Sequence, residues 1–294
     1  MTVSPLEAST PRFPTGLRYM VLAAFFFSLM ALLVKVAGQR LPTAEMVLAR
    51  SVVAVVLSYG MLRRANVNPW GQRKGLLIFR GLAGFGGLLC MFYALTKLPL
   101  ADATVIVYTN PVFTAILAAL FLREMMGRRE VLGLLLSLGG VVLVAQPAFL
   151  FGAAADSLDL FAVGIALLGA IFASIAYVSV RKLGETEHHL VVVFYFPLVA
   201  TPASIPFMIS EALWPTPVEW LILLGIGVVT QIAQVYLTKG LHTEKAGRAM
   251  SMSYVQIVFA ALWGFLFFTE VPDLLSILGA MLVVAGTVVV ARAA

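Results

Sequence analysis

The sequence predicts an all-α polytopic membrane protein, with ten transmembrane helices arranged as two inverted five-helix repeats. Three observations predict this fold: a very apolar composition, an internal repeat and an uneven distribution of basic residues. Of the 294 residues, 61% are hydrophobic and 12% are charged, and the mean hydropathy is +1.00. Soluble domains carry about 25% charged residues. The apolar side chains are therefore expected to face lipid. The net charge of +6 resides between apolar runs, so we expect no nucleic-acid partner.

The repeat relates two stretches of the chain at a constant offset of 146 residues. The matched pairs are Ser28 with Ser174, Lys35 with Arg181, Tyr108 with Tyr254, Asn110 with Gln256, Phe113 with Phe259, Glu124 with Glu270, Gly133 with Gly279, and Gly140 with Gly286. We therefore divide the chain into an N-terminal tail (1–16), a first repeat (17–148) and a second repeat (159–291). A linker, Phe149 to Leu158, joins the repeats.

Each repeat contains five apolar runs close to the ~20 residues that cross a bilayer core. The first five expected spans are Leu17–Val36, Ala44–Leu62, Leu76–Thr96, Asp102–Leu122 and Glu130–Ala148. The second five are Asp159–Val180, Leu190–Ser210, Val218–Thr238, Ala249–Phe268 and Leu274–Ala291. The N-terminal tail is polar and proline-rich, and a full-length span follows it, so we expect no cleaved signal peptide.

The positions of Lys and Arg predict the orientation. With the N-terminus in the cytoplasm, fifteen of these residues lie on the cytoplasmic side and three, Lys35, Arg40 and Lys97, on the other. Basic residues favour the cytoplasmic side, so both termini are expected there. Because five is an odd number, the second repeat must enter the membrane from the opposite side. Inverted repeats of this kind are common among secondary transporters, whose solute site lies near the midplane where the repeats meet.

Polar side chains cluster at matched positions of the fourth and ninth spans. In the fourth span, Tyr108 and Asn110 precede Pro111, which removes a backbone donor and predicts a break in the helix. The matching cluster in the ninth span is Ser251, Ser253, Tyr254 and Gln256. Such clusters either hold helices together or line a central cavity. Their symmetry favours the cavity.

The eighth span carries a polar stripe, and several other spans carry aromatic residues. Thr230, Gln231, Gln234 and Thr238 share one helical face. The stripe either lines a solute path or bonds neighbouring helices, and Gln231 and Gln234 are its best candidates for solute binding. Tyr93, Tyr177 and Trp263 are candidates for a wall that stacks on flat solutes.

Ionisable residues inside the spans are few. Arg50 is the most interior charge, and Arg80 lies nearer the cytoplasmic end of its span. We expect both to be structural, as arginines that snorkel or bind backbone carbonyls. The carboxylates and histidines fall in loops, tails or the end turns of spans. A buried acidic relay is therefore not expected, and we predict facilitated rather than proton-coupled transport.

Parts of this pattern resemble the EamA repeat of the drug/metabolite transporter superfamily. The residues that carry the resemblance are Tyr93-Ala94-Leu95, Ala101, Ala103, Asn110-Pro111-Val112-Phe113 and Glu124, with Arg50 and Arg80 as the family's recurrent arginines. The resemblance covers both halves. The second half departs from it, with Ile257 opposite Pro111 and Phe196 opposite Arg50, which implies that the halves are not functionally equal. Within the family, the chain is most similar to the YddG-type exporters of aromatic amino acids.

The resemblance implies a membrane exporter of aromatic or apolar amino acids and related metabolites, working by alternating access in the cell inner membrane. A drug or a nucleotide sugar is the alternative cargo, and a scaffold or receptor is a rival role. An intramembrane enzyme is not expected, because no nucleophile with a base, carboxylate pair or metal cluster lies in the spans. We expect no metal and no cofactor, a small-molecule solute and the lipid bilayer as partners, and a monomer or weak dimer.

Overall fold

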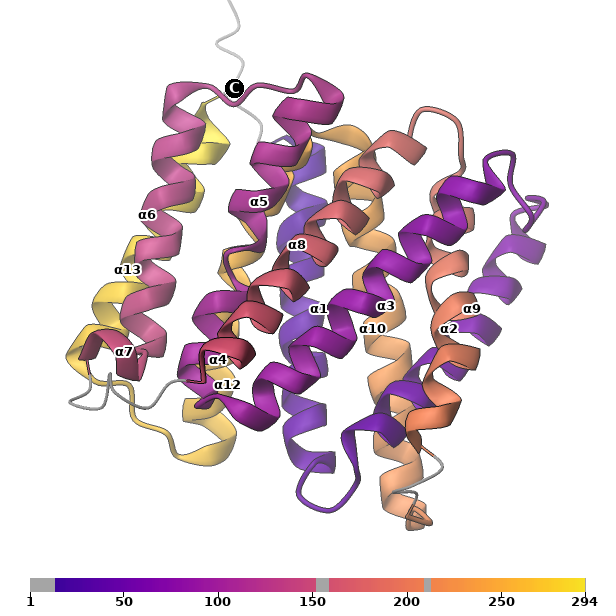
Figure 1. Ribbon diagram of the computed structural model, residues 1–294, viewed down its shortest axis with the longest axis horizontal. Coiled ribbons are helices and arrows are strands. Elements are labelled where there is room, and N and C mark those ends of the chain that lie inside the picture. The colour runs from indigo at the N-terminus through magenta and orange to yellow at the C-terminus, as the bar shows by residue number, and fades with distance from the viewer. Residues whose placement is uncertain (1–13, 152–158, 209–212, 294) are drawn as a thin grey trace, which may run out of the picture.

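The computed structural model describes residues 14–151, 159–208 and 213–293, and these ranges fold into helices without a strand (Figure 1). Most of the tail 1–16 and of the linker 149–158 lies outside the described residues. The elements of the first half are α1 (Thr15–Ala37), α2 (Thr43–Arg64), α3 (Lys74–Lys97), α4 (Leu100–Val107), α5 (Asn110–Leu117), the π-helical η1 (Ala118–Leu122), α6 (Arg128–Ala145) and the short α7 (Ala148–Phe151). Those of the second half are α8 (Leu160–Leu183), α9 (His189–Met208), α10 (Pro217–Thr243), α11 (Ala246–Ser251), the 3₁₀ turn η3 (Met252–Tyr254), α12 (Val255–Phe268) and α13 (Leu274–Arg292).

Nine segments of the described chain are long and apolar enough to cross a membrane. They match nine of the ten expected spans, with α4–α5–η1 and α11–η3–α12 each counting as one broken segment. The one expected span that is not among the nine is the fifth, Glu130–Ala148, which corresponds to α6. Helix α6 has 18 residues and begins with Arg128, Arg129 and Glu130. Helix α6 nevertheless packs along α13. A tenth crossing therefore stays a prediction.

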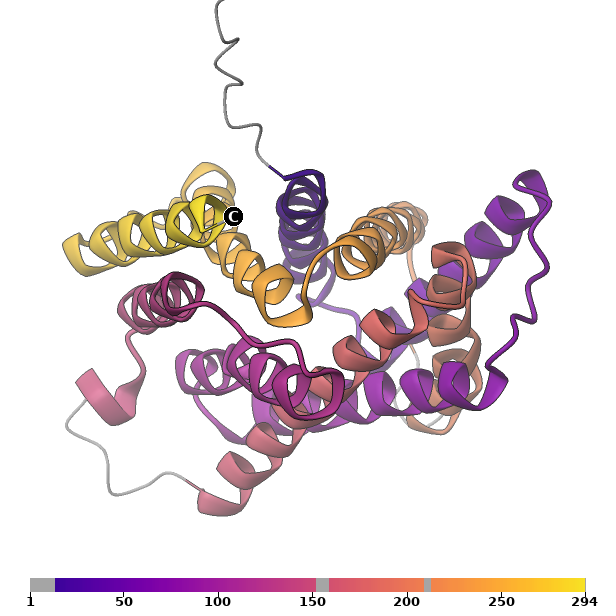
Figure 2. The same ribbon diagram turned by 90° about the horizontal axis from the view of Figure 1, so that it is seen from above.

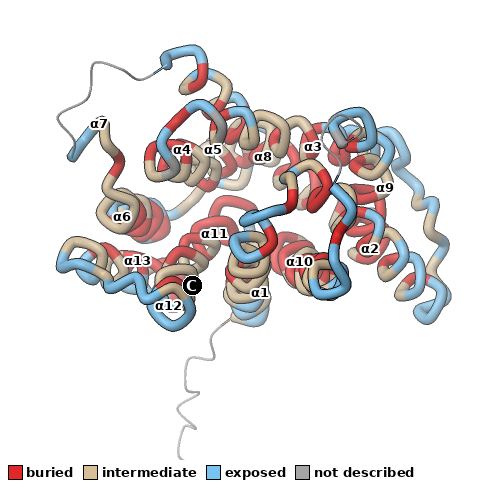
Figure 3. Tube along the Cα trace, turned by 90° about the horizontal axis from the view of Figure 1, so that it is seen from below, coloured by how far each residue is buried: buried red, intermediate tan, exposed pale blue. Residues whose placement is uncertain are grey.

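The helices form two layers, and each half contributes two helices to the layer of the other. In Figure 3, one layer contains α6, α4, α5, α8, α3 and α9, and the other contains α13, α12, α11, α1, α10 and α2. Thus α8 and α9 lie with the helices of the first half, and α1 and α2 with those of the second. The view from above also shows α8 and α1 in these places (Figure 2). Pairs α3–α8 and α1–α10 have the same packing in the two layers. The exchange makes the cavity between the layers a product of both halves.

Close glycine contacts show how the halves are related. A Cβ on Gly133 of α6 would lie 2.6 Å from the carbonyl oxygen of Gly286 on α13, and a Cβ on Gly279 would lie 2.6 Å from that of Gly140. Exchanging the halves at the offset of 146 residues turns one contact into the other. The later residue of one helix meets the earlier residue of its partner, so α6 and α13 are antiparallel. A two-fold relation between antiparallel helices requires an axis across them, as in an inverted repeat.

The fourth span is broken where the sequence predicts it. Helix α4 ends at Val107, and α5 begins at Asn110 directly before Pro111. The ninth span is broken at the matching place, through the 3₁₀ turn Met252–Tyr254, although no proline stands there. The second half therefore has the same break in its helix as the first, although it lacks the proline that explains the break in the first half.

The described ends of the chain lie on one face of the bundle. Gly16, at the start of α1, lies against Thr243 and Glu244 at the end of α10. Next to them, Arg248 donates to the carbonyl oxygen of Ala291 near the end of α13 at 3.4 Å. Both termini therefore leave from the same side, which the expected even number of crossings requires. That this side is cytoplasmic remains a prediction from the basic residues.

Candidate functional site

A cavity of about 290 Å³ lies at the centre of the bundle, between the two layers. Its wall contains side chains of α1, α2, α3, α8, α9 and α10 and of both broken spans. Eight of the residues singled out in the sequence line it: Arg50, Arg80, Tyr108, Asn110, Tyr177, Gln234, Ser253 and Gln256. The matched polar clusters thus meet in one cavity, as their symmetry predicts.

The two broken spans touch at the pseudo-two-fold axis. The hydroxyl of Tyr254 donates to the backbone carbonyl of Tyr108 at 2.9 Å, and the two rings stack with centroids 6.1 Å apart. These residues are partners at the repeat offset, so the contact lies on the axis. A break in a helix leaves carbonyls without their intrahelical donors, and Tyr254 supplies one. Tyr254 is completely buried by this contact and does not line the cavity, contrary to its assignment as a solute-binding residue.

Asn110 lines the cavity and has a buried side-chain acceptor. Its amide nitrogen donates to the carbonyl of Val107 at 2.8 Å, while its backbone carbonyl accepts from the hydroxyl of Ser174 at 2.9 Å. These two bonds hold the side chain and the break in place. The side-chain oxygen Oδ1 is buried and has no hydrogen-bond partner among the described residues. A buried amide oxygen without a donor is costly, so it is suited to accept from a solute.

Two arginines face the same aromatic ring in the cavity wall. The guanidinium carbon of Arg80 lies 4.7 Å from the ring centre of Phe196, and that of Arg50 lies 5.9 Å from it. Arg80 also donates to Oε1 of Gln234 at 3.4 Å, and Arg50 lies 3.7 Å from the sulfur of Met30. None of the described lining residues is Asp or Glu. The cavity therefore carries two positive charges with no acidic partner.

The structure corrects the expectation for these arginines. Arg80 is only 3% exposed, and its Nε and Nη1 atoms are buried without a hydrogen-bond partner in the described chain, so it does not snorkel to the interface. Arg50 also faces the cavity, and we find no hydrogen bond from it to a described backbone carbonyl. Phe196 is the residue that the sequence analysis missed. Its position opposite Arg50 in the repeat was the available signal.

The polar stripe of α10 is divided between two roles. Gln234 lines the cavity, whereas Gln231 is 3% exposed and donates to the hydroxyl of Ser58 on α2 at 2.7 Å. Thr230 bonds back to the carbonyl of Ile226. In this structure Gln231 joins two helices and is not among the described residues that line the central cavity. Gln231 lies three residues before Gln234, and three residues fall about one-sixth of a turn short of a full helical turn. The Gln231 side chain therefore points in a different direction from that of Gln234.

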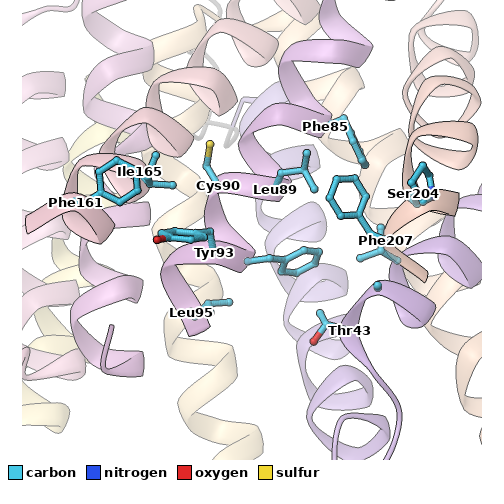
Figure 4. Close-up of a pocket in the computed structure, with 14 residues that line it drawn as sticks. Thr43, Phe85, Leu89, Cys90, Tyr93, Leu95, Phe161, Ile165, Ser204 and Phe207 are labelled. Carbon is cyan, nitrogen blue, oxygen red and sulfur yellow. The ribbon is translucent and has the colours of Figure 1, made fainter. Parts of the chain in front are cut away.

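Tyr93 and Trp263 also lie outside the central cavity. Tyr93 lines a wider apolar cavity of about 890 Å³ between the α3–α8 pair and the ends of α2 and α9, where its ring meets Phe161 edge-on at 6.1 Å (Figure 4). No residue of that lining is shared with the central cavity. Trp263 donates from its indole nitrogen to the hydroxyl of Ser28 at 2.9 Å and lines a third cavity, of about 470 Å³, near Lys35. Neither aromatic residue can touch a solute in the centre.

The chain is similar in sequence to a family of known transporters. The sequence model of the EamA-like transporter family matches residues 14–146 and again 160–292. The chain is 39% identical over 279 residues to the pseudopaline exporter CntI of Pseudomonas aeruginosa, covering 95% of this chain and 96% of the relative. It is 32% identical over 285 residues to human solute carrier family 35 member G1, covering 93% and 78%.

A solved crystal structure shares the fold. It superposes with a TM-score of 0.82 at 20% identity and covers 95% of this chain and 98% of the other. The two matches of the family model, at residues 14–146 and 160–292, agree with two tandem repeats. The chain belongs to the EamA-like transporter family, and it is a multi-pass membrane transporter of that type.

Proposed function

We propose that this transporter exports amino acids and related small metabolites across the cell inner membrane by alternating access between its two repeats. One observation carries the proposal: the polar residues of both broken spans converge on a cavity at the axis that relates the repeats. A site on that axis meets equivalent helices on either side, so rocking one repeat against the other would expose it alternately. The similarity to an exporter supports the direction.

The cavity suits a small amphoteric solute. Its volume of about 290 Å³ lies just below the range for ligand sites, which starts near 300 Å³. The arginines bind carboxylates, and the free oxygen of Asn110 accepts from an ammonium group. Tyr108, Tyr177 and Phe196 offer aromatic contacts to an apolar side chain. These groups favour an amino acid over a purely apolar drug.

Transport by this cavity is proposed to be facilitated. Its described lining contains no Asp, Glu or His that could take up and release a proton. Asp102 is fully buried, and its carboxylate oxygens have no hydrogen-bond partner among the described residues, but it lies in the first turn of α4 and does not line the cavity. Accumulation of solute driven by a pH difference alone would refute this part of the proposal, and loss of that drive in Asp102→Asn would identify the proton site.

A phosphorylated solute such as a nucleotide sugar is the second candidate. It gains support from Arg80, which adds a second positive charge to the one that the sequence analysis placed in the interior. The small cavity volume favours the amino acid. An enzymatic or scaffold role is not proposed, because neither requires a cavity on the axis between the repeats.

Counterflow in proteoliposomes tests the proposal directly. Vesicles loaded with one member of an amino-acid panel should take up the labelled amino acid, and exchange of none of them by folded protein would contradict it. Gln234→Ala should lower the exchange rate about tenfold, because a hydrogen bond to a charged group is worth about 1.5–3 kcal/mol. The matched control is Gln146→Ala.

Gln146 suits that purpose because it lies away from the cavity. Its amide donates to Asp273 at 2.7 Å, and hydrogen bonds from Ser276 and Gln146 hold the pKa of Asp273 below its usual value. Exchange by Gln146→Ala should stay close to that of the unmodified protein. Equal losses in the two variants would show that Gln234 acts through general packing.

A further inference from the structure

The unpaired arginines of the central cavity define its ligand more narrowly than the fold does. An arginine side chain stays protonated in proteins, and a buried charge without a counter-charge is unfavourable. Arg50 and Arg80 line one cavity whose described wall contains no acidic side chain. Their polar contacts within the described chain are a thioether sulfur and a single amide oxygen. A negatively charged ligand would supply the charge that the described wall lacks.

The arrangement around Phe196 leaves the arginines ready to bind. Both guanidinium groups lie over the same ring, which contacts them without consuming their N–H donors. In Arg80, the Nε and Nη1 donors are buried and unused within the described chain. The two guanidinium carbons can be no farther apart than the sum of their distances to the ring centre. A small solute with a carboxylate at each end spans such a separation.

Asn110 favours a hydrogen-bond donor on the ligand, whereas the two arginines favour anionic groups. The Oδ1 atom of Asn110 is a buried acceptor without a donor, and its residue lines the same cavity. Its orientation is set, because its amide nitrogen is held by the carbonyl of Val107. An acceptor beside two arginines is matched by a ligand that carries a protonated amine as well as anionic groups.

We propose that the solute is a small amine with two carboxylates, in which Arg50 and Arg80 each bind one carboxylate and Asn110 accepts a hydrogen bond from the ammonium group. This inference rests on the proposed function and deepens it. It replaces the expectation of an aromatic or apolar amino acid by a dicarboxylic one. It also assigns Arg50 and Arg80 to solute binding instead of to structure.

Matched pairs of solutes test the charge requirement in the unmodified, full-length protein. Proteoliposome counterflow would compare glutamate with glutamine and 2-aminoadipate with its side-chain amide, and glutarate would report on the amine. We expect the dicarboxylic amines to exchange at least tenfold more efficiently than their amides, and glutarate to be weaker. Equal exchange of acid and amide overturns this inference alone. Exchange of no panel member, with no thermal stabilisation by any of them, overturns the proposed function as well.

Variants of the arginines provide the second test. Arg80→Gln and Arg50→Gln should each abolish the tenfold preference for glutamate over glutamine while glutamine exchange persists. The control is Arg63→Gln on α2, an exposed arginine that bonds the hydroxyl of Tyr59 at 3.1 Å, and it should keep the preference. A preference retained in both cavity variants overturns the proposal.

Stability in detergent separates binding from a structural role. Because Arg80 is buried without a charge partner, Arg80→Gln should not lower the midpoint of thermal unfolding in the absence of ligand, and glutamate should no longer raise it. A large fall in the midpoint would assign Arg80 to structure and contradict the proposal. If Arg80→Gln does not fold, Arg80→Lys keeps the charge and should retain part of the preference.

Discussion

Two ion pairs at opposite ends of the molecule are copies of each other, yet they differ in environment. Arg181 and Glu124 form one pair on the predicted cytoplasmic side, and Lys35 and Glu270 form the other on the predicted external side. The offset of 146 residues converts one pair into the other. Each glutamate follows a residue in the left-handed region, Arg123 with φ 57° or Thr269 with φ 54°. The local backbone is therefore the same at the two ends.

The side chains around these pairs are different. Arg181 also donates to the carbonyl of His242 at 2.8 Å, and Glu124 accepts from the backbone nitrogen of Ala246 at 2.8 Å, so the pair connects the end of α8 to the α10–α11 junction. Their side chains are 26% and 15% exposed. Lys35 and Glu270 are 50% and 58% exposed and border a cavity of about 470 Å³.

The difference teaches which end of the transporter is closed. An alternating-access transporter is never open at both ends at once, so equivalent contacts at its two ends need not be equally tight in one conformation. Here the cytoplasmic copy is tied to a third helix, and the external copy is open to its surroundings. We infer that the predicted cytoplasmic end is the more firmly closed of the two in this conformation.

Glu124→Gln should have the largest effect, because it breaks the closed end. Arg181 would keep its position with its charge uncompensated, and the free energy of unfolding should fall by about 1–3 kcal/mol. The closed end should also open. In a Cys90→Ser background, a cysteine at the buried cavity residue Met250 should react faster with a maleimide added from the cytoplasmic side. An unchanged labelling rate would contradict the assignment of this pair as a closure.

Lys35→Arg should have an intermediate effect, because it gives the open end the arginine of the closed end. An arginine can bind the carboxylate of Glu270 with two parallel hydrogen bonds. We expect external closure to be favoured and counterflow to slow by about twofold to fivefold, the range that exposed pairs of 0.2–1 kcal/mol allow. Faster exchange would show that the difference between Lys35 and Arg181 is not what keeps the external end open.

Glu270→Gln should have the smallest effect on stability. The side chain of Lys35 is about half exposed and that of Glu270 is more than half exposed. Exposed ion pairs contribute little to stability. The free energy of unfolding should change by no more than about 0.5 kcal/mol. A loss as large as that of Glu124→Gln would mean that the two pairs are equivalent and would remove the basis for distinguishing the ends.

Much of the candidate site could be predicted because it follows from the repeat. Asn110 and Gln256 are partners at a constant offset, and equivalent residues of two related halves meet where the axis passes. The break before Pro111 was predictable from the missing backbone donor. The repeat also pairs Tyr108 with Tyr254. It did not show that the Tyr254 hydroxyl donates to a backbone carbonyl or that Tyr254 is fully buried.

The direction in which each side chain points was not predictable at the same level. Gln231 and Gln234 belong to one polar stripe, and only the packing of α2 against α10 separates them. Arg80 lies close enough to a span end to reach the interface, and the position of Phe196 on α9 holds it inside instead. Such choices depend on which neighbour fills the space.

The sequence by itself determined the class of protein, the membrane location, the duplication and the residues that meet at the axis, because hydropathy and a constant offset are properties of the chain alone. Only the tertiary structure decided which polar groups are unpaired, since that depends on contacts between helices far apart in sequence. Two arginines without an acidic partner and one amide oxygen without a donor cannot be recognised from a list of residues. The proposed solute rests on these features.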